Sequence, residues 1–199
     1  MDHFHQWYAV IIFIIIYGSV LLFMPFYSKM EKKPKGVYLA FVIAFAIEMH
    51  GIPFSMYLIS IVIGRYLPEG ILWGHTLIGS VGYLGLYLNI ILVVIGMLII
   101  IIGWYHIYHG YWKKVKGRGH VCQSGIYRYI RHPQYTGLMF IALGMLAGWA
   151  TLTNILLFPV IVYMYVRLAK KEEAMMIEEF HEEYRLYQEK TKKFIPFIW

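Results

Sequence analysis

The chain has 199 residues, of which 60% are hydrophobic and only 15% carry a charged side chain, whereas soluble domains contain about 25% charged residues. This composition excludes an ordinary soluble domain and predicts an all-α, polytopic integral membrane protein. The formal net charge of +7 does not indicate nucleic-acid binding, because the basic residues lie in loops between apolar segments. A single cysteine, Cys122, excludes an internal disulfide and a CxxC metal site.

Five apolar segments are expected to form transmembrane helices, which need about 20 residues to cross the hydrocarbon. They lie at residues 7–26, 37–63, 84–106, 134–149 and 155–168. We expect the first to be a retained helix rather than a signal peptide, because neither a basic leader nor a small-residue cleavage site accompanies it. Pro53 is expected to kink the second helix. Gly79, Gly82 and Gly85, before and at the start of the third, fall three apart, a spacing that favours close helix packing.

The fourth and fifth segments are short, and a polar corner at residues 150–154 joins them into a helical hairpin that either just crosses the membrane or re-enters it. Seventeen of the 18 Lys and Arg residues lie in residues 28–36, in residues 111–131 or after residue 166. With five spans these basic segments share one side, so the positive-inside rule places the N-terminus outside and the C-terminus in the cytosol.

The tail from Ala169 mixes charged residues with apolar ones at spacings of three and four, which predicts an amphipathic cytosolic helix. We expect the chain from 1 to 199 to form a single membrane domain. In it, residues 1–112 supply the N-terminal transmembrane helices, and residues 113–199 supply a catalytic loop, the helical hairpin and the tail.

Chemistry-bearing residues gather in the stretch from Ser124 to Gly137, which holds two arginines, one histidine and three tyrosines beside a proline and two glycines. Ionisable groups at a membrane boundary are costly and tend to mark function. The two arms of the hairpin are antiparallel, so Arg131 and His132 at its entry are expected to meet Glu172 and Glu173 at its exit. The sequence therefore predicts a cytosolic pocket that contains cations, acids and aromatic rings.

These residues also resemble a known family. The run Arg-His-Pro-Gln-Tyr-Thr-Gly at 131–137, followed by Glu172 and Glu173, is similar to the RHPxYxG…EE signature of the isoprenylcysteine carboxyl methyltransferase family, within a wider group that includes phospholipid methyltransferases. The ending at 180–196 resembles the family's FGxEYxxY…P pattern, with His181 where glycine is usual. The resemblance covers about residues 116–196, and the short chain looks like a prokaryotic integral membrane relative.

The resemblance implies methyl transfer from S-adenosylmethionine to the carboxylate of an isoprenylcysteine-like or other lipid acceptor, with no metal. The residues that it implies for cofactor binding are His120, Val121, Tyr127, His132, Pro133, Tyr135, Glu172 and Glu173. Those implied for catalysis are Arg131, Arg167 and Glu173, of which Arg167 is the candidate for the acceptor carboxylate. The expected partners are a lipid or prenylated acceptor and the membrane lipids.

The residue chemistry agrees with this assignment. The cofactor's ammonium group pairs with a glutamate, and its carboxylate pairs with an arginine or a histidine. Its sulfonium is a cation that aromatic faces can hold. A carboxylate acceptor is already ionised at neutral pH, so catalysis would depend on positioning and on the exclusion of water. An amine acceptor would instead require His132 or a glutamate to accept a proton.

Three other functions remain open from the sequence: a phospholipid or amine N-methyltransferase, a membrane NADPH-dependent reductase, and a non-enzymatic transporter or scaffold. Glu48 and His50 inside the second segment either touch the cofactor site, shape the acceptor path, or satisfy each other in a kinked backbone. His106 and His109 are expected to be interfacial anchors rather than metal ligands. The other glutamates of the tail are expected to form a solvated face: Glu178, Glu179, Glu182 and Glu183.

Overall fold

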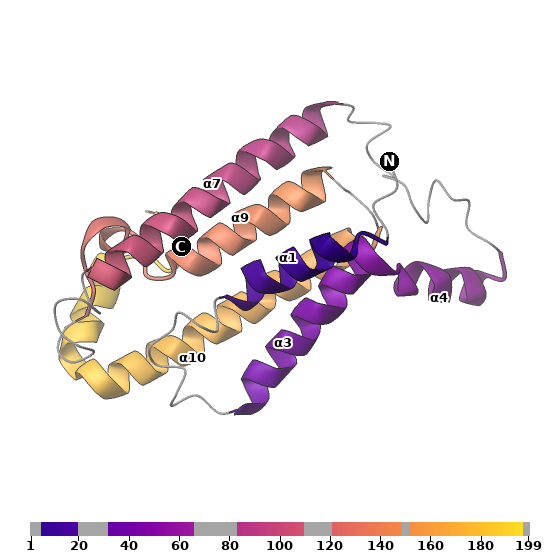
Figure 1. Cartoon of the computed structure of the whole chain (residues 1–199). Coiled ribbons are helices and arrows are strands. Elements are labelled where there is room, and N and C mark those ends of the chain that lie inside the picture. The colour runs from indigo at the N-terminus through magenta and orange to yellow at the C-terminus, as the bar shows by residue number, and fades with distance from the viewer. Residues whose placement is uncertain (1–4, 20–31, 66–82, 110–120, 149–151, 197–199) are drawn as a thin grey trace. The chain divides into compact units, whose positions relative to one another are not determined.

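The computed structural model describes residues 5–19, 32–65, 83–109, 121–148 and 152–196 (Figure 1). Every named element in these ranges is a helix, which confirms the all-α prediction for the described part of the chain. Contacts divide the chain into two compact units. Unit 1 comprises Met1–Ile90 with Leu143–Val160, and unit 2 comprises Ile91–Ala142 with Ile161–Trp199. Of the predicted features, Gly79, Gly82, His120 and parts of the two basic loops, residues 28–31 and 111–120, lie outside the described residues.

The N-terminal helices of unit 1 are α1 (Trp7–Gly18), α3 (Lys32–Ala46), the π-helical turn η2 (Ile47–Gly51) and α4 (Phe54–Ile63). The Tyr38 hydroxyl on α3 donates a hydrogen bond to the carbonyl of Tyr17 on α1 at 3.0 Å. The ring of Tyr17 also packs edge-on against that of Phe45. Both tyrosines are 1% exposed, so this aromatic contact forms the core between α1 and α3.

The second predicted segment is broken at Pro53, where the two helical halves meet at 75°. Proline lacks the N–H that would continue the helix, and the predicted kink is confirmed. The carbonyls of His50 and Gly51 accept hydrogen bonds from the backbone N–H groups of Gln6 and His5 at 2.8 and 2.9 Å. The chain before α1 therefore satisfies backbone groups at the break.

Glu48 and His50 both belong to η2 and have different surroundings. The Glu48 carboxylate accepts hydrogen bonds from the backbone N–H of Ser55, at 3.1 and 3.2 Å, and from its hydroxyl. Ser55 lies in the first turn of α4, where backbone N–H groups lack helical partners. His50 is 2% exposed, and its ring lies 4.7 Å from that of Phe13. Glu48 thus caps the second half of the broken helix.

Helix α7 (Tyr83–Ile107) is long and apolar enough to cross a membrane, and only 17% of its most apolar stretch is buried. The bent pair Tyr38–Gly51 and Phe54–Ile63 is long enough only when its two halves are taken as one span, and α1 is a shorter apolar helix. Within the described residues, one or two helices could therefore cross a membrane by length and composition. The five-span arrangement stays a prediction.

Glycines bring α7 and α9 (Pro133–Gly148) into backbone contact. In unit 2, a Cβ on Gly96 would lie 2.5 Å from the carbonyl oxygen of Gly137, and a Cβ on Gly103 would lie 3.2 Å from Pro133. In unit 1, a Cβ on Gly85 would lie 2.6 Å from the carbonyl oxygen of Ala147. Close packing predicted for Gly85 is thus confirmed, and it continues at two glycines that the sequence reading did not single out.

Helix α10 (Leu152–Lys190) joins the fifth predicted segment to the tail without a break at Ala169. Its backbone leaves helical geometry at His181, where φ is 46° and ψ is −118°. L-residues rarely adopt such a conformation, whereas glycine adopts it at little cost. The bend therefore lies at the position where the resembled family usually has glycine.

We expect His181→Gly to raise the free energy of unfolding by about 1 kcal/mol, because it relieves backbone strain worth about 1–3 kcal/mol and loses some chain entropy. His181→Ala removes the same ring but keeps the strained φ, so it is the matched control and should give no gain. Thermal unfolding in detergent measures both. Equal melting temperatures for the two variants would contradict a strained backbone at this position.

Candidate functional site

Residues 129–132, which include the first two residues of the motif, are held against segment 191–194 by backbone hydrogen bonds within unit 2. The N–H of Arg131 donates to the carbonyl of Lys192 at 2.9 Å, and the N–H of His132 donates to that of Lys193 at 3.1 Å. An isolated parallel bridge joins Ile130 to Lys192. The carbonyl of Phe194 accepts from the Thr136 hydroxyl at 2.9 Å. The C-terminal segment 191–194 is therefore part of the site.

Local sequence chemistry sets the start of α9. Pro133 is the first residue of the helix, a position that needs no N–H donor. The residue before a proline is driven away from helical geometry, so His132 lies just outside the helix. Its carbonyl accepts the N–H and the hydroxyl of Thr136 at 3.0 and 3.1 Å. His132 is thus fixed at the N-terminal end of α9.

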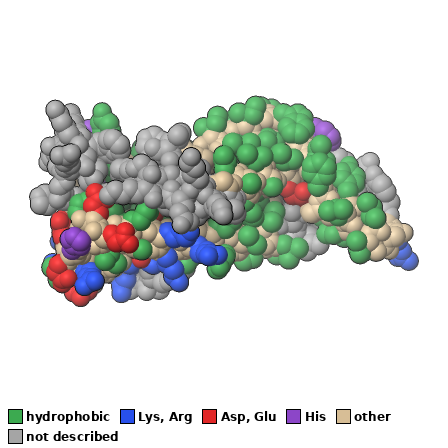
Figure 2. Space-filling model, turned by 90° about the horizontal axis from the view of Figure 1, so that it is seen from below, with side chains coloured by type: hydrophobic (Ala, Val, Ile, Leu, Met, Phe, Trp, Pro, Cys, Tyr) green, Lys and Arg blue, Asp and Glu red, His purple; other side chains and the backbone are tan. Residues whose placement is uncertain are grey.

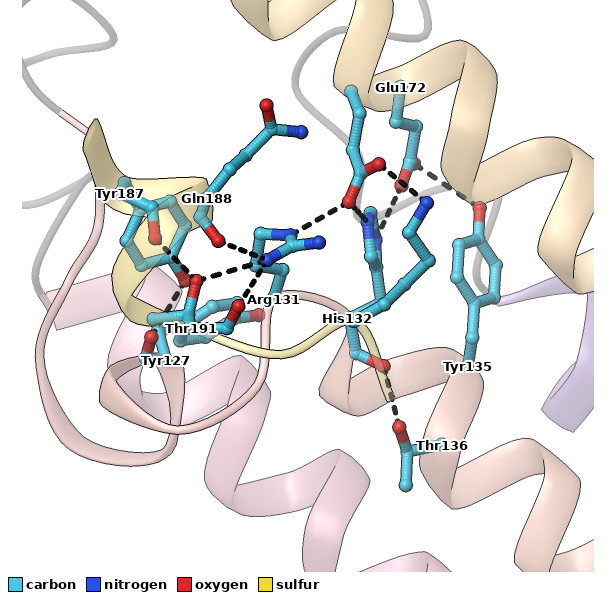
Figure 3. Close-up of polar contacts among 11 residues, drawn as sticks. Tyr127, Arg131, His132, Tyr135, Thr136, Glu172, Tyr187, Gln188 and Thr191 are labelled. Atoms are coloured by element: carbon cyan, nitrogen blue, oxygen red, sulfur yellow. Dashed lines mark hydrogen bonds and ion pairs between the residues drawn. The ribbon is translucent and has the colours of Figure 1, made fainter. Parts of the chain in front are cut away.

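The His132 imidazole lies between two carboxylates from α10 (Figure 3). Its Nδ1 is 3.1 Å from Oε2 of Glu172, and its Nε2 is 3.2 Å from Oε1 of Glu173. All three residues are less than 9% exposed. The structure therefore brings together the motif and the glutamate pair, which are about forty residues apart in sequence.

Two cationic side chains, Arg131 and Lys193, and the imidazole of His132 surround Glu173. Its Oε1 accepts from Nε of Arg131 at 2.8 Å and lies near His132, while its Oε2 is 2.7 Å from Nζ of Lys193. Burial alone would raise the pKa of Glu173, but hydrogen bonds from His132, Lys193 and Arg131 lower it to about 2. Glu173 is therefore a carboxylate at neutral pH.

Glu172 has fewer partners, namely His132 and the Tyr135 hydroxyl, which donates to its Oε1 at 3.2 Å. Burial raises the pKa of Glu172 above its ordinary value despite these two bonds. Burial would lower the pKa of His132, but hydrogen bonds to both glutamates raise it. The site thus holds a charged Glu173, a Glu172 whose pKa is raised, and an imidazole that contacts both.

Aromatic rings line the same cluster. The ring of Tyr135 stacks on that of Tyr165 at 5.3 Å and on that of His132 at 5.7 Å. The ring of Phe194 lies 5.8 Å from His132. Tyr135, Tyr165 and Phe194 are all 0% exposed, so they form flat apolar walls beside the charges. Aromatic faces attract cations, of which a sulfonium is one.

Arg131 connects the cluster to the end of α10. Besides Glu173, its guanidinium donates to the carbonyl of Gln188 at 3.0 Å and to both the carbonyl and the hydroxyl of Thr191 (Figure 3). All three of these bonds come from Nη1, while Nε donates to Glu173. Arg131 therefore fixes Glu173 and the chain end in a single arrangement.

Two residues of this cluster, Lys193 and Thr191, were not predicted from the sequence. Charged side chains gather over the C-terminal half of α10 (Figure 2). In the sequence, Lys193 is one of seven basic residues after residue 166. The signal that could have found it is its position beside Phe194-Ile195-Pro196, the ending that the family resemblance includes. That ending pairs with the motif.

Other predicted site residues lie outside the cluster. Tyr127 is buried, and its hydroxyl accepts from the Gln134 amide, while its carbonyl accepts from the Tyr187 hydroxyl at 2.7 Å. Burial raises the pKa of the Tyr127 phenol well above its ordinary value. Pro133 packs near Gly103 of α7. Arg167 is exposed on α10 and is not among the residues that contact Glu172 or Glu173.

Val121 contacts the bent end of α10. It packs with Tyr184 and Tyr187 in a small apolar cluster, and its N–H donates to Oε1 of Glu183 at 3.0 Å. The prediction that Glu183 belongs to a solvated face is therefore wrong. Its carboxylate is half-buried and anchors the segment before the motif. Glu182, by contrast, is 72% exposed in its side chain and lies 3.8 Å from Arg185.

His106 and His109 each place Nδ1 near a backbone carbonyl one turn earlier, at 2.8 Å from Ile102 and 3.0 Å from Tyr105. Within the described ranges, no three His, Cys, Asp or Glu side chains gather as a metal site would require. A cavity of about 500 Å³ lies beside the bend of α10. Its lining consists of Ile177, Glu178, His181, Glu182 and Arg185, none of which belongs to the motif.

Comparison with known proteins adds family membership. A family model described as "Protein of unknown function (DUF1295)" matches residues 65–191, well over half of the chain. The chain belongs to this family. It is also 33% identical, over 76 residues, to a Protein-S-isoprenylcysteine O-methyltransferase of Schizosaccharomyces pombe. That match covers 38% of this chain and 32% of the relative, so the chain spans about a third of the curated relative's length. It supports membership in an isoprenylcysteine methyltransferase-like or related family.

Proposed function

We propose that the protein is an integral membrane S-adenosylmethionine-dependent methyltransferase that acts on the carboxylate of a lipid acceptor. The observation that carries this proposal is the buried cluster of His132 with Glu172 and Glu173. Around it, Arg131 and Lys193 supply further positive charge. The S. pombe relative, by its printed name, is a methyltransferase of S-isoprenylcysteine, and the shared region supports the same reaction class here.

The residues of the cluster fit the chemistry of S-adenosylmethionine. Its α-ammonium group requires a carboxylate, and Glu173 is held ionised. Its α-carboxylate requires a cation, and Arg131, His132 and Lys193 are close by. Its adenine and sulfonium suit the rings of Tyr135 and Phe194. Glu172 would add a second acceptor for the ammonium or for a ribose hydroxyl.

The bound cofactor supplies an electrophilic methyl group on a positively charged sulfur. An acceptor carboxylate is already ionised at neutral pH, so no residue of the chain needs to remove a proton. The buried rings of Tyr135 and Tyr165 exclude water, which would otherwise solvate the nucleophile. Arg131 fixes the orientation of Glu173, and we assign to the exposed Arg167 the binding of the acceptor carboxylate. Catalysis then rests on positioning.

The proposed topology places this cluster in the cytosol. In this topology the chain forms one membrane domain with five spans in the membrane of a prokaryotic cell. The N-terminus lies outside, and the lipid acceptor enters the site from the bilayer. The exposed apolar surface of α7 supports contact with lipid, and the basic loops support the orientation. Reporter fusions at residues 1 and 199 test it, because the two ends must report opposite sides.

A lipid amine is the second candidate acceptor, and the raised pKa of Glu172 favours it. Methylation of an amine releases a proton, and a carboxylate with a raised pKa is a stronger base for that proton than an ordinary one. Phosphatidylethanolamine is therefore the alternative candidate acceptor to a prenylcysteine carboxylate.

Two measurements on detergent-purified protein test the proposal. Calorimetry should detect binding of S-adenosylhomocysteine and none of NADPH; binding of NADPH alone would favour a reductase, and binding of neither would favour a transporter or scaffold. Transfer of a labelled methyl group to N-acetyl-S-farnesylcysteine should give a base-labile ester, and the corresponding amide should accept nothing. Base-stable label on phosphatidylethanolamine would assign the amine reaction instead.

A further inference from the structure

Lys193 contacts the cluster from the last segment of the described chain. Its Nζ lies 2.7 Å from Oε2 of Glu173, the shortest of the three charge contacts that Glu173 makes. The side chain of Lys193 is 17% exposed, compared with 10% for Arg131 and 6% for His132. Lys193 is therefore the cation of the cluster that solvent and solutes reach most easily.

The other two cations have further partners that fix them. Arg131 also donates to Gln188 and Thr191, and both ring nitrogens of His132 face carboxylates. The ammonium of Lys193 has one polar partner, Glu173, within the described residues. It can leave that carboxylate without breaking another polar contact, and Glu173 keeps Arg131 and His132 as partners when it does.

The backbone of Lys193 stays in place during such a change. Its carbonyl accepts the N–H of His132, and the next residue is held by Thr136 and by the ring contact between Phe194 and His132. The four-carbon stem of a lysine is flexible and carries a compact charge. The ammonium can therefore move within the site while the chain does not.

We propose that Lys193 is a cofactor-binding residue that exchanges partners: it leaves Glu173 and binds the α-carboxylate of the methyl donor, while Glu173 takes the donor's α-ammonium in its place. This inference rests on the proposed function. The amino-acid end of the donor is a zwitterion, so the exchange replaces one ammonium on Glu173 by another. The released lysine meets the new negative charge. The net charge of the buried cluster stays unchanged, which avoids the cost of an uncompensated charge.

The exchange predicts discrimination between two ligands. S-adenosylhomocysteine has both charged groups, and its decarboxylated analogue keeps only the ammonium. Wild type should bind S-adenosylhomocysteine at least about tenfold more tightly than the analogue, as expected for a hydrogen bond between charged groups. Lys193→Met should lose most of this preference, because the analogue never used the lysine, and Lys193→Arg should keep part of it.

Lys192→Met is the matched control, since its side chain is exposed and only its backbone pairs with the motif. It should leave both affinities unchanged. Thermal unfolding of each variant shows whether the fold is kept, and Lys193→Gln serves as the second test if Lys193→Met is unstable. If folded Lys193→Met and Lys193→Gln keep the wild-type ratio of the affinities for S-adenosylhomocysteine and its decarboxylated analogue, this inference is overturned and the proposed function still stands. Failure of wild type to bind either ligand would overturn the proposed function with it.

Discussion

Glu173→Gln should lower the stability of the protein by about 3 kcal/mol, because removing one member of a buried charge group leaves the others uncompensated. Arg131, His132 and Lys193 all direct positive charge at this carboxylate. Glutamine keeps the shape but supplies a neutral amide. The same substitution should weaken S-adenosylhomocysteine binding by about 100-fold, since the ligand's ammonium loses its charged partner. Chemical unfolding in detergent and calorimetry measure the two effects.

The pH dependence of stability separates the charge of Glu173 from its packing. Its pKa lies at about 2 in the folded protein, below the ordinary value of 4.5. A lowered folded-state pKa contributes stability above pH 4.5 that is lost as the pH falls toward 2. Wild type should therefore lose stability through this window more steeply than Glu173→Gln, which has no carboxyl group to titrate there.

Two other glutamates on α10 serve as controls. Glu178→Gln alters an exposed side chain, so stability and binding should stay as in wild type. Glu172→Gln should cost less than Glu173→Gln, because burial already raises the pKa of Glu172 and its charge is more easily given up. Similar losses for Glu173→Gln and Glu178→Gln would show that the cluster does not depend on this charge.

The contact between the motif and the glutamate pair could be predicted from the sequence, because two antiparallel apolar arms bring the residues at their open ends close together. A short corner joins them, so His132 at the entry must lie near Glu172 and Glu173 at the exit. The break at Pro53 was predictable for a similar reason, since a missing N–H leaves a specific helical bond unmade. The π-helical turn before it was not, because no residue type requires one.

The contribution of the chain end could not be predicted, because it depends on a backbone bend and on backbone pairing. Glu173 and Lys193 are twenty residues apart and would lie about 30 Å apart in a straight helix, yet their charged atoms are 2.7 Å apart. The bend at His181 and the pairing of Ile130 with Lys192 account for this return. Neither follows from apolar periodicity. For the same reason the contact of Glu183 with Val121 was missed.

Gly137 ends the motif, and its role is packing rather than chemistry. A Cβ added there would lie 2.6 Å from the carbonyl oxygen of Gly96 and 2.6 Å from Ile100 Cγ1, both on α7. The first of these is a backbone atom, so no side-chain rotation relieves the clash and α9 must move away from α7. Gly137→Ala should therefore cost about 3 kcal/mol, at the upper end for overpacking. Thermal unfolding in detergent measures it.

The matched control is Gly36→Ala in α3, where an added Cβ meets no described atom within 4 Å. Alanine is the better helix former by about 1 kcal/mol, so this substitution should stabilise the protein slightly. Gly96→Ala should reproduce the loss at Gly137, because its Cβ would lie 2.5 Å from the Gly137 carbonyl oxygen. A neutral Gly137→Ala would mean that α9 can shift. His132 and Tyr135 lie at the start of α9. A shift of this helix in Gly137→Ala or Gly96→Ala should therefore weaken ligand binding together with stability.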